Sequence, residues 1–124
     1  MTNIDLVNSI FTILKAGGII MPIIQFSKAD NDVKAEYYAI NCLANQWLNP
    51  IEVVQVNINC HVKDLANSIP DLTKLNTNTQ AIKNILNEYS NGTIEAYLVF
   101  EAGPIKEQQL NEHYMNLRFD VSIT

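Results

Sequence analysis

The segment Ile51–Asp64 constrains the fold more than any other part of the sequence. From Val54 to Lys63, apolar residues occupy every second position and polar residues fill the positions between them. The apolar set is Val54, Val56, Ile58, Cys60 and Val62, and the polar set is Gln55, Asn57, Asn59, His61 and Lys63. Because successive side chains of a strand point to opposite faces, this pattern predicts a long strand with one face in a core. Asparagine is a poor strand former, so burial of the apolar set decides the structure here.

The polar face of this strand is a candidate contact surface. It is rich in amides and poor in charge, so we expect it to be hydrated or to contact another subunit. The predicted interface residues are Trp47, Gln55, Asn57, Asn59 and His61. Trp47 lies in the polar connection Asn45–Pro50 and has two readings. It either folds back over a sheet edge or anchors an interface, where Trp is enriched.

Two further segments have the apolar spacing of helices. Asn3–Leu14 repeats apolar residues at intervals of three and four, with Thr2 or Asn3 as its cap. The pair Gly17-Gly18 ends this helix by supplying a left-handed conformation. A second helix is predicted to begin at a Ser68 cap, with a proline in its first turn.

The remaining apolar runs are short and read as strands. They are Met21–Ser27, Ala35–Leu43, Ile94–Phe100 and His113–Ile123. The last of these alternates again, with Met115, Leu117, Phe119, Val121 and Ile123 predicted to point inward. The predicted order is helix, three strands, helix, two strands, which lacks the regular rhythm of a parallel sheet. We therefore expect one α+β domain over residues 1–124, with about five mostly antiparallel strands and both helices on one face.

The two cysteines are predicted to remain reduced. If Ala35–Leu43 and the long strand form a hairpin over the loop Ala44–Pro50, Cys42 lies opposite Glu52 and Cys60 lies opposite Lys34. The two sulfur atoms would then be several residue pairs apart, which is too far for a disulfide.

The sequence contains no recognisable catalytic, cofactor-binding or metal-binding motif. His61 and His113, with Asp64 and Glu112 as possible companions, lack the spacing of a zinc site. We therefore predict structural or surface roles for both histidines, no catalytic residues, no cofactor and no enzymatic activity.

Charge and hydropathy bear on partners. The chain carries 13 acidic and 8 basic residues, a net charge of −5, and its cations are scattered. Tight binding to phosphate backbones needs clustered Lys or Arg, so specific nucleic-acid binding is not expected, nor is binding to anionic membranes. No apolar run approaches the length of a membrane span.

The sequence resembles a family of virion proteins in its middle third and in its element order. The residues that carry the resemblance are Glu36–Asn41, Val53–Leu65 and Ile69–Leu72. They are similar to small proteins of phages and prophages of Bacteroides-type bacteria, laid out like the tail terminator or tail-completion proteins of long-tailed phages. That family has a first helix, a target strand, a long alternating strand leading into a second helix, and two closing strands.

The resemblance implies a function in assembly. Such subunits form a ring, commonly a hexamer, which caps the tail tube, stops its polymerisation and joins it to the head connector. The implied partners are other copies of the chain, the tail-tube protein and the connector or neck protein. The implied location is the virion, after assembly in the host cytoplasm.

Two other functions fit the sequence. One is a neck or head-completion protein, which has the same size, acidity and fold class. The other is a small cytoplasmic α+β enzyme or ligand-binding domain, which would need His61, His113, Tyr97 and Arg118 to converge on one pocket.

Overall fold

The computed structural model describes residues 1–25, 36–48, 51–66, 68–107 and 110–124, with only the backbone described for 44–48 and 51. The elements in chain order are α1 (Asn3–Ala16), β1 (Ile23–Gln25), β2 (Glu36–Leu48), β3 (Ile51–Lys63), α2 (Leu72–Leu86), β4 (Tyr89–Ser90), β5 (Ile94–Glu107) and β6 (Glu112–Ile123). The predicted α+β class and element order are confirmed, with the two-residue strand β4 added. The sequence also favours a polar turn at Lys28–Asp32, a segment that lies outside the described residues.

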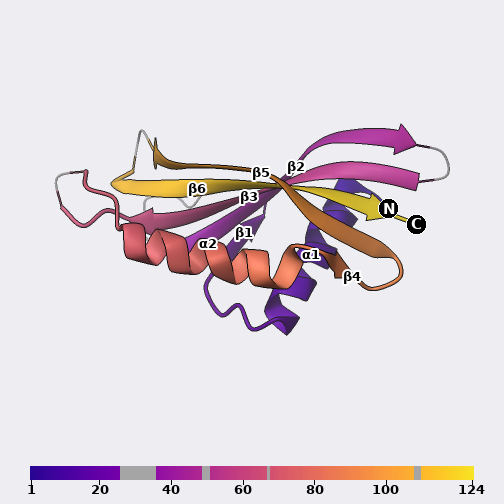
Figure 1. The fold of residues 1–124 in the computed structure, drawn as a ribbon, viewed down its shortest axis with the longest axis horizontal. Coiled ribbons are helices and arrows are strands. Elements are labelled where there is room, and N and C mark those ends of the chain that lie inside the picture. Colours follow the sequence, from indigo (N-terminus) through magenta and orange to yellow (C-terminus); the bar gives the residue numbers. More distant parts are fainter. Residues whose placement is uncertain (26–35, 49–50, 67, 108–109) are drawn as a thin grey trace.

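The strands form one sheet in the order β1-β2-β3-β6-β5-β4. All neighbouring strands are antiparallel except β1 and β2, which are parallel. Figure 1 shows α1 and α2 on the same face of this twisted sheet. The long strands β3 and β6 lie side by side at its centre.

The hydrophobic core lies between the helices and the inward faces of β3 and β6. All five apolar residues predicted to face inward from β3 are buried. On β6, Leu117, Phe119 and Val121 are buried, and Met115 and Ile123 pack against the same core. The period-two alternation therefore identified the core face of both central strands.

The sequence predicted the N-terminal cap of α1 correctly but not that of α2. Thr2 caps α1 as predicted, because its hydroxyl accepts the Asp5 N–H at 3.1 Å and the Asp5 carboxylate accepts the Thr2 N–H at 3.0 Å. The predicted Ser68 cap of α2 is wrong. Ser68 has a φ of +63° inside a turn, and Asp71 caps the helix by accepting the Lys74 N–H at 3.2 Å.

The hairpin between β2 and β3 is tighter than predicted. Pairing continues to Leu48 and Ile51, so the connection is residues 49–50 and not a loop over 44–50. Cys42 therefore lies opposite Val56, and Cys60 lies opposite Tyr38. Backbone pairing carries the strands past the polar residues because their N–H and C=O groups gain partners there. The cysteines still lie in different residue pairs and both are free thiols.

The strand β5 also runs further than predicted. Its pairing with β6 continues past Phe100 to Glu107 across two irregularities in register. Gly103 has a φ of +134°, and a Cβ there would lie 2.9 Å from the Tyr114 carbonyl oxygen. Glycine thus lets the two backbones approach closely at the point where the sequence suggested an end. The strand β6 begins at Glu112, one residue before the predicted start at His113.

Candidate functional site

A buried histidine lies between two tyrosine rings at the end of the sheet where α2 begins. His61 of β3 is 2% exposed. Its ring stacks on Tyr37 of β2, with centroids 4.5 Å apart and planes 6° apart, and on Tyr114 of β6, with centroids 4.8 Å apart. The three residues are direct neighbours across adjacent strands, since Tyr37 and Tyr114 both pair with His61. The strand register therefore builds this stack.

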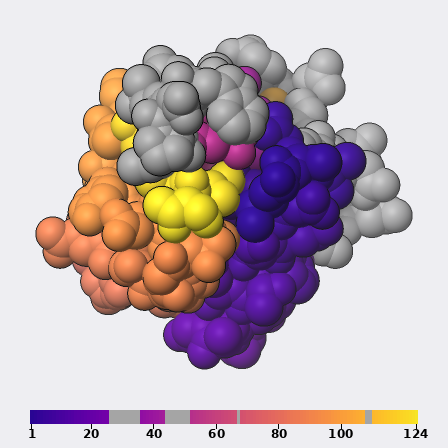
Figure 2. Space-filling model, turned by 90° about the vertical axis from the view of Figure 1, so that its right-hand side faces the viewer, coloured from indigo at the N-terminus to yellow at the C-terminus, as the bar shows by residue number. Residues whose placement is uncertain are grey.

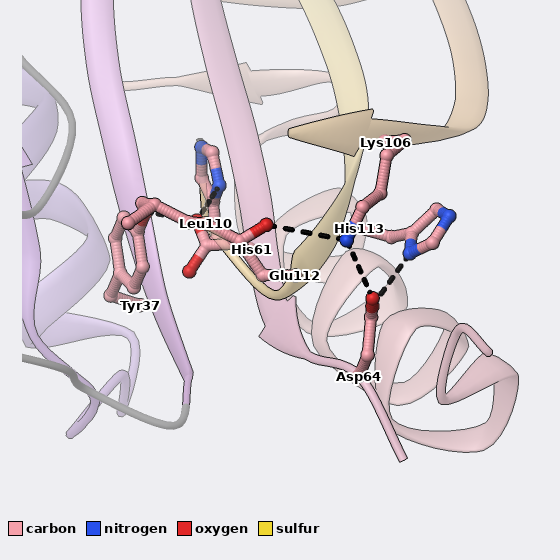
Figure 3. Close-up of polar contacts among 7 residues, drawn as sticks. All are labelled: Tyr37, His61, Asp64, Lys106, Leu110, Glu112 and His113. Atoms are coloured by element: carbon pink, nitrogen blue, oxygen red, sulfur yellow. Dashed lines mark hydrogen bonds and ion pairs between the residues drawn. The ribbon is translucent and has the colours of Figure 1, made fainter. Parts of the chain in front are cut away.

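A carboxylate joins this stack from the start of β6. The Oε1 atom of Glu112 lies 2.8 Å from Nδ1 of His61, and the Tyr37 hydroxyl donates to the same carboxylate (Figure 3). Both Glu112 and His61 are buried. A buried carboxylate is stable when its oxygens accept hydrogen bonds, and two side chains supply them here.

A second carboxylate and histidine pair lies nearby. The Asp64 side chain has no exposed surface, and its oxygens lie 2.6 Å from Nδ1 of His113 and 2.8 Å from Nζ of Lys106 (Figure 3). Burial acts to raise the pKa of Asp64, but the hydrogen bonds and charges of His113 and Lys106 outweigh it and lower the pKa below its ordinary value. Lys106 Nζ also donates to the Leu110 carbonyl oxygen at 3.3 Å.

Neither histidine contacts the acidic residue that is nearest to it in the sequence. Each histidine has an acidic residue close to it in the chain, Asp64 for His61 and Glu112 for His113. In the structure His61 contacts Glu112, and His113 contacts Asp64. His113 pairs with Val62, whose side chain belongs to the buried inward set, whereas Tyr114 pairs with His61. The alternation of strand side chains therefore sends the two histidines to opposite faces.

The His61–Glu112 and His113–Asp64 pairs are hydrogen-bonded contacts that link strands of the sheet. Among the residues the structure describes, no three His, Cys, Asp or Glu side chains are grouped to hold a metal ion. Each carboxylate contacts two side chains from strands: Glu112 contacts Tyr37 of β2 and His61 of β3, and Asp64 contacts Lys106 of β5 and His113 of β6. Sequence reasoning named all four partners but had no signal for the crossed pairing, which depends on the register of β3 and β6.

The predicted interface residues do not form one exposed surface. Asn57 and His61 are buried, and Gln55 and Asn59 are half-buried. The Asn116 amide donates to the side-chain oxygens of Asn57 and Asn59, the latter at 2.7 Å. The expectation of a hydrated face is therefore wrong for Asn57 and His61, because cross-strand amides and aromatic rings cover them. The side chain of Trp47 lies outside the described residues, and its backbone pairs with Glu52 in the hairpin.

The four residues of the ligand-binding hypothesis do not converge. His113 faces the helices, whereas His61 lies on the other face of the sheet. Tyr97 pairs with Asp120, and Arg118 pairs with Phe100 on one side and Asn57 on the other. Both residues therefore lie several positions along the strands from His61. The guanidinium of Arg118 rests 4.9 Å from the centre of the Phe100 ring. The pocket that this hypothesis specified is not formed.

A groove lies elsewhere, between α1 and the segment that joins α2 to β5. It has a volume of about 830 Å³ and lies where the indigo α1 meets the orange residues near 85–94 in Figure 2. Its walls include Thr12 and Ile13 of α1, Ile85 of α2, and Tyr89 and Thr93 across from them. No local sequence pattern predicts this groove, because it depends on how α1 packs beside β4.

No protein-family model matches the chain, and no curated protein matches its sequence. Within the described residues, no helix has the length and apolar character needed to cross a membrane.

Proposed function

We propose that this chain is a ring-forming structural subunit of a phage or prophage tail, which caps the tail tube and joins it to the head connector. The observation that carries the proposal is the architecture. One helix precedes a short strand and a long hairpin, the second hairpin strand leads into α2, and two long strands close the sheet. Apart from the short strands β1 and β4, this order agrees with the layout that the resemblance to tail terminators implies.

The two histidine–carboxylate contacts support a role as a structural subunit. His61 of β3 contacts Glu112 of β6, and Asp64, the residue after β3, contacts His113 of β6 and Lys106 of β5. Such ties fix the geometry of one end of the sheet. A subunit that repeats around a ring needs a rigid body with constant edges, and ties of this kind supply it.

The experiment is deletion of the gene from its phage or prophage, followed by electron microscopy of the particles. Loss of a terminator should leave tail tubes of uncontrolled length and heads without joined tails. Restoring the gene should return tails of uniform length. Tails of normal length joined to heads after deletion would contradict the proposal.

The same images separate the tail terminator from a neck or head-completion protein. Loss of a neck protein leaves tails of normal length beside unjoined heads, because tube polymerisation still stops on time. Gold labelling of a tagged chain at the head-proximal end of free tails would favour the terminator. Labelling only on heads would favour the neck protein.

The groove beside α1 favours a second candidate function, binding of a small ligand. Its volume of about 830 Å³ falls within the usual size of ligand sites, about 300–1,000 Å³. Thermal unfolding in a library of small metabolites tests this candidate. A ligand that raises the Tm of the protein but not that of a Thr12→Trp variant would support it, since Trp at that position fills the groove.

A further inference from the structure

The turn that joins β4 to β5 contains the only Asn-Gly pair of the chain, Asn91-Gly92 (Figure 1). Both residues are exposed. The Oδ1 atom of Asn91 accepts the Thr93 N–H at 2.9 Å and the Ile94 N–H at 2.8 Å. The Asn91 N–H donates to the Ile94 carbonyl oxygen at 3.1 Å. The side-chain amide of Asn91 is therefore held in one orientation while it remains open to water.

The backbone nitrogen of Gly92 is free to react. Its N–H donates to no group in the part of the chain that the structure describes, although its carbonyl oxygen accepts the Thr124 hydroxyl at 3.2 Å. Gly92 has a φ of +89°, and a Cβ there would meet no atom within 4 Å. Since glycine has no side chain, nothing on Gly92 itself hinders an approach of this nitrogen to the side chain of Asn91.

The two donors on Asn91 Oδ1 lie where negative charge would develop. When a nitrogen attacks an amide carbon, the electron pair of the C=O bond moves onto the oxygen. Fixed N–H groups about 2.7–3.1 Å from such an oxygen stabilise the charge. The N–H groups of Thr93 and Ile94 have this spacing. The turn thus combines a free nucleophile with an amide whose oxygen already has two donors.

We propose that Asn91 is a site of spontaneous deamidation in the folded protein. The Gly92 nitrogen forms a bond to Cγ of Asn91, and the Cγ–Nδ2 bond breaks. Ammonia leaves with the proton that the Gly92 nitrogen gave up, and a five-membered succinimide ring remains. Water then adds to one of the two ring carbonyl groups and opens the ring, which gives aspartate or isoaspartate at position 91.

The conversion changes the groove beside α1, because Asn91 is one of its lining residues. No charged side chain lines this groove among the described residues. Either product places a carboxylate there. The isoaspartate form also adds a carbon to the main chain of the turn. Deamidation would therefore alter both the charge of the groove and the connection between β4 and β5, whatever the function of the protein.

The experiment follows position 91 in folded and unfolded wild type. Both samples are kept in the same mildly alkaline buffer, one of them with urea, and are digested at intervals for mass spectrometry. Electron-transfer fragmentation separates aspartate from isoaspartate. Asn91 should convert to both products, and at least as fast in the folded protein as in urea, because the two donors are fixed only in the fold.

Two controls separate the turn from general reactivity. Asn8 is also exposed and precedes a small residue, but the N–H of Ser9 lies inside α1 and is bonded within the helix, so Asn8 should stay intact in the folded protein. Gly92→Ala should slow the conversion, because a Cβ crowds the attacking nitrogen. Gly18→Ala makes the same change at another residue with positive φ and should leave the rate unchanged. Circular dichroism establishes that both variants fold.

Three results would overturn the inference. One is slower conversion of Asn91 in the folded protein than in urea, or none, which would mean that the fold protects the amide. Another is equal conversion of Asn8 and Asn91 in the folded protein, which would mean that the turn has no influence. The third is aspartate without isoaspartate, which would indicate direct hydrolysis by water and not attack by Gly92.

Discussion

His61 and Glu112 form a buried contact of 2.8 Å between residues 51 positions apart in the chain. The contact joins the middle of the chain to the start of its last strand, and Tyr37 donates to the same carboxylate. One glutamate therefore connects side chains from β2, β3 and β6. Its removal would delete both of these buried contacts.

We expect Glu112→Ala to destabilise the protein by about 3 kcal/mol, because breaking a buried charged contact leaves its partners unsatisfied. Urea unfolding followed by circular dichroism measures the change. Glu95→Ala is the control, since Glu95 is exposed on β5 and such surface changes stay within about 0.5 kcal/mol. Equal effects of the two variants would contradict a stabilising role for the Glu112 contacts.

The contacts of Asp64 should make the free energy of unfolding depend on pH in the acid range. Its pKa in the folded state lies below the ordinary value of 3.8. An acid with a lowered folded-state pKa stabilises the protein above the unfolded pKa, and this stabilisation disappears as pH falls through the folded pKa. Wild type should therefore exceed Asp64→Asn in stability at neutral pH, with a difference that shrinks below pH 3.8.

Urea unfolding of both proteins across the acid range measures that difference. A constant difference from neutral to strongly acidic pH would show that the Asp64 charge makes no contribution. A stability difference between wild type and Asp64→Asn that grows as pH falls would contradict a lowered pKa of Asp64.

The two thiols should differ in reactivity. Burial raises the pKa of Cys60 to about 12, and it also raises the pKa of the half-buried Cys42. Since the thiolate is the reactive form, an alkylating reagent should modify Cys60 only after unfolding, and Cys42 slowly in the folded protein. Mass spectrometry with and without urea measures this. Rapid modification of Cys60 in the folded protein would contradict the prediction.

Gly17 and Gly18 should tolerate alanine differently. A Cβ at Gly17 would lie 2.8 Å from Cδ1 of Ile85, so Gly17→Ala should cost about 1–3 kcal/mol through overpacking of α1 against α2. A Cβ at Gly18 meets no atom within 4 Å, but its φ is +104°. Gly18→Ala should therefore cost about 1–2 kcal/mol through backbone strain alone.

The Ile85→Ala background separates these two causes. The effect of Gly17→Ala on the free energy of unfolding should fall in that background, because the crowded side chain has been removed. The effect of Gly18→Ala should not change. A reduction of both effects, or of neither, would contradict the assignment.

The sequence by itself determined the elements whose signals are local. The alternation of β3 and β6 identified their core faces, and the Thr2 cap located the start of α1, because side-chain direction and capping depend on neighbouring residues. The order of the elements followed from the same signals and was enough to predict the α+β class.

Only the tertiary structure decided the contacts that depend on register. The sequence placed Asp64 beside His61 and Glu112 beside His113, whereas the fold joined His61 to Glu112 and His113 to Asp64. A shift of one residue between β3 and β6 would send every side chain to the other face, and no local pattern specifies that register. The polar face of β3 was readable as polar, but its burial depended on rings and amides supplied by β2 and β6.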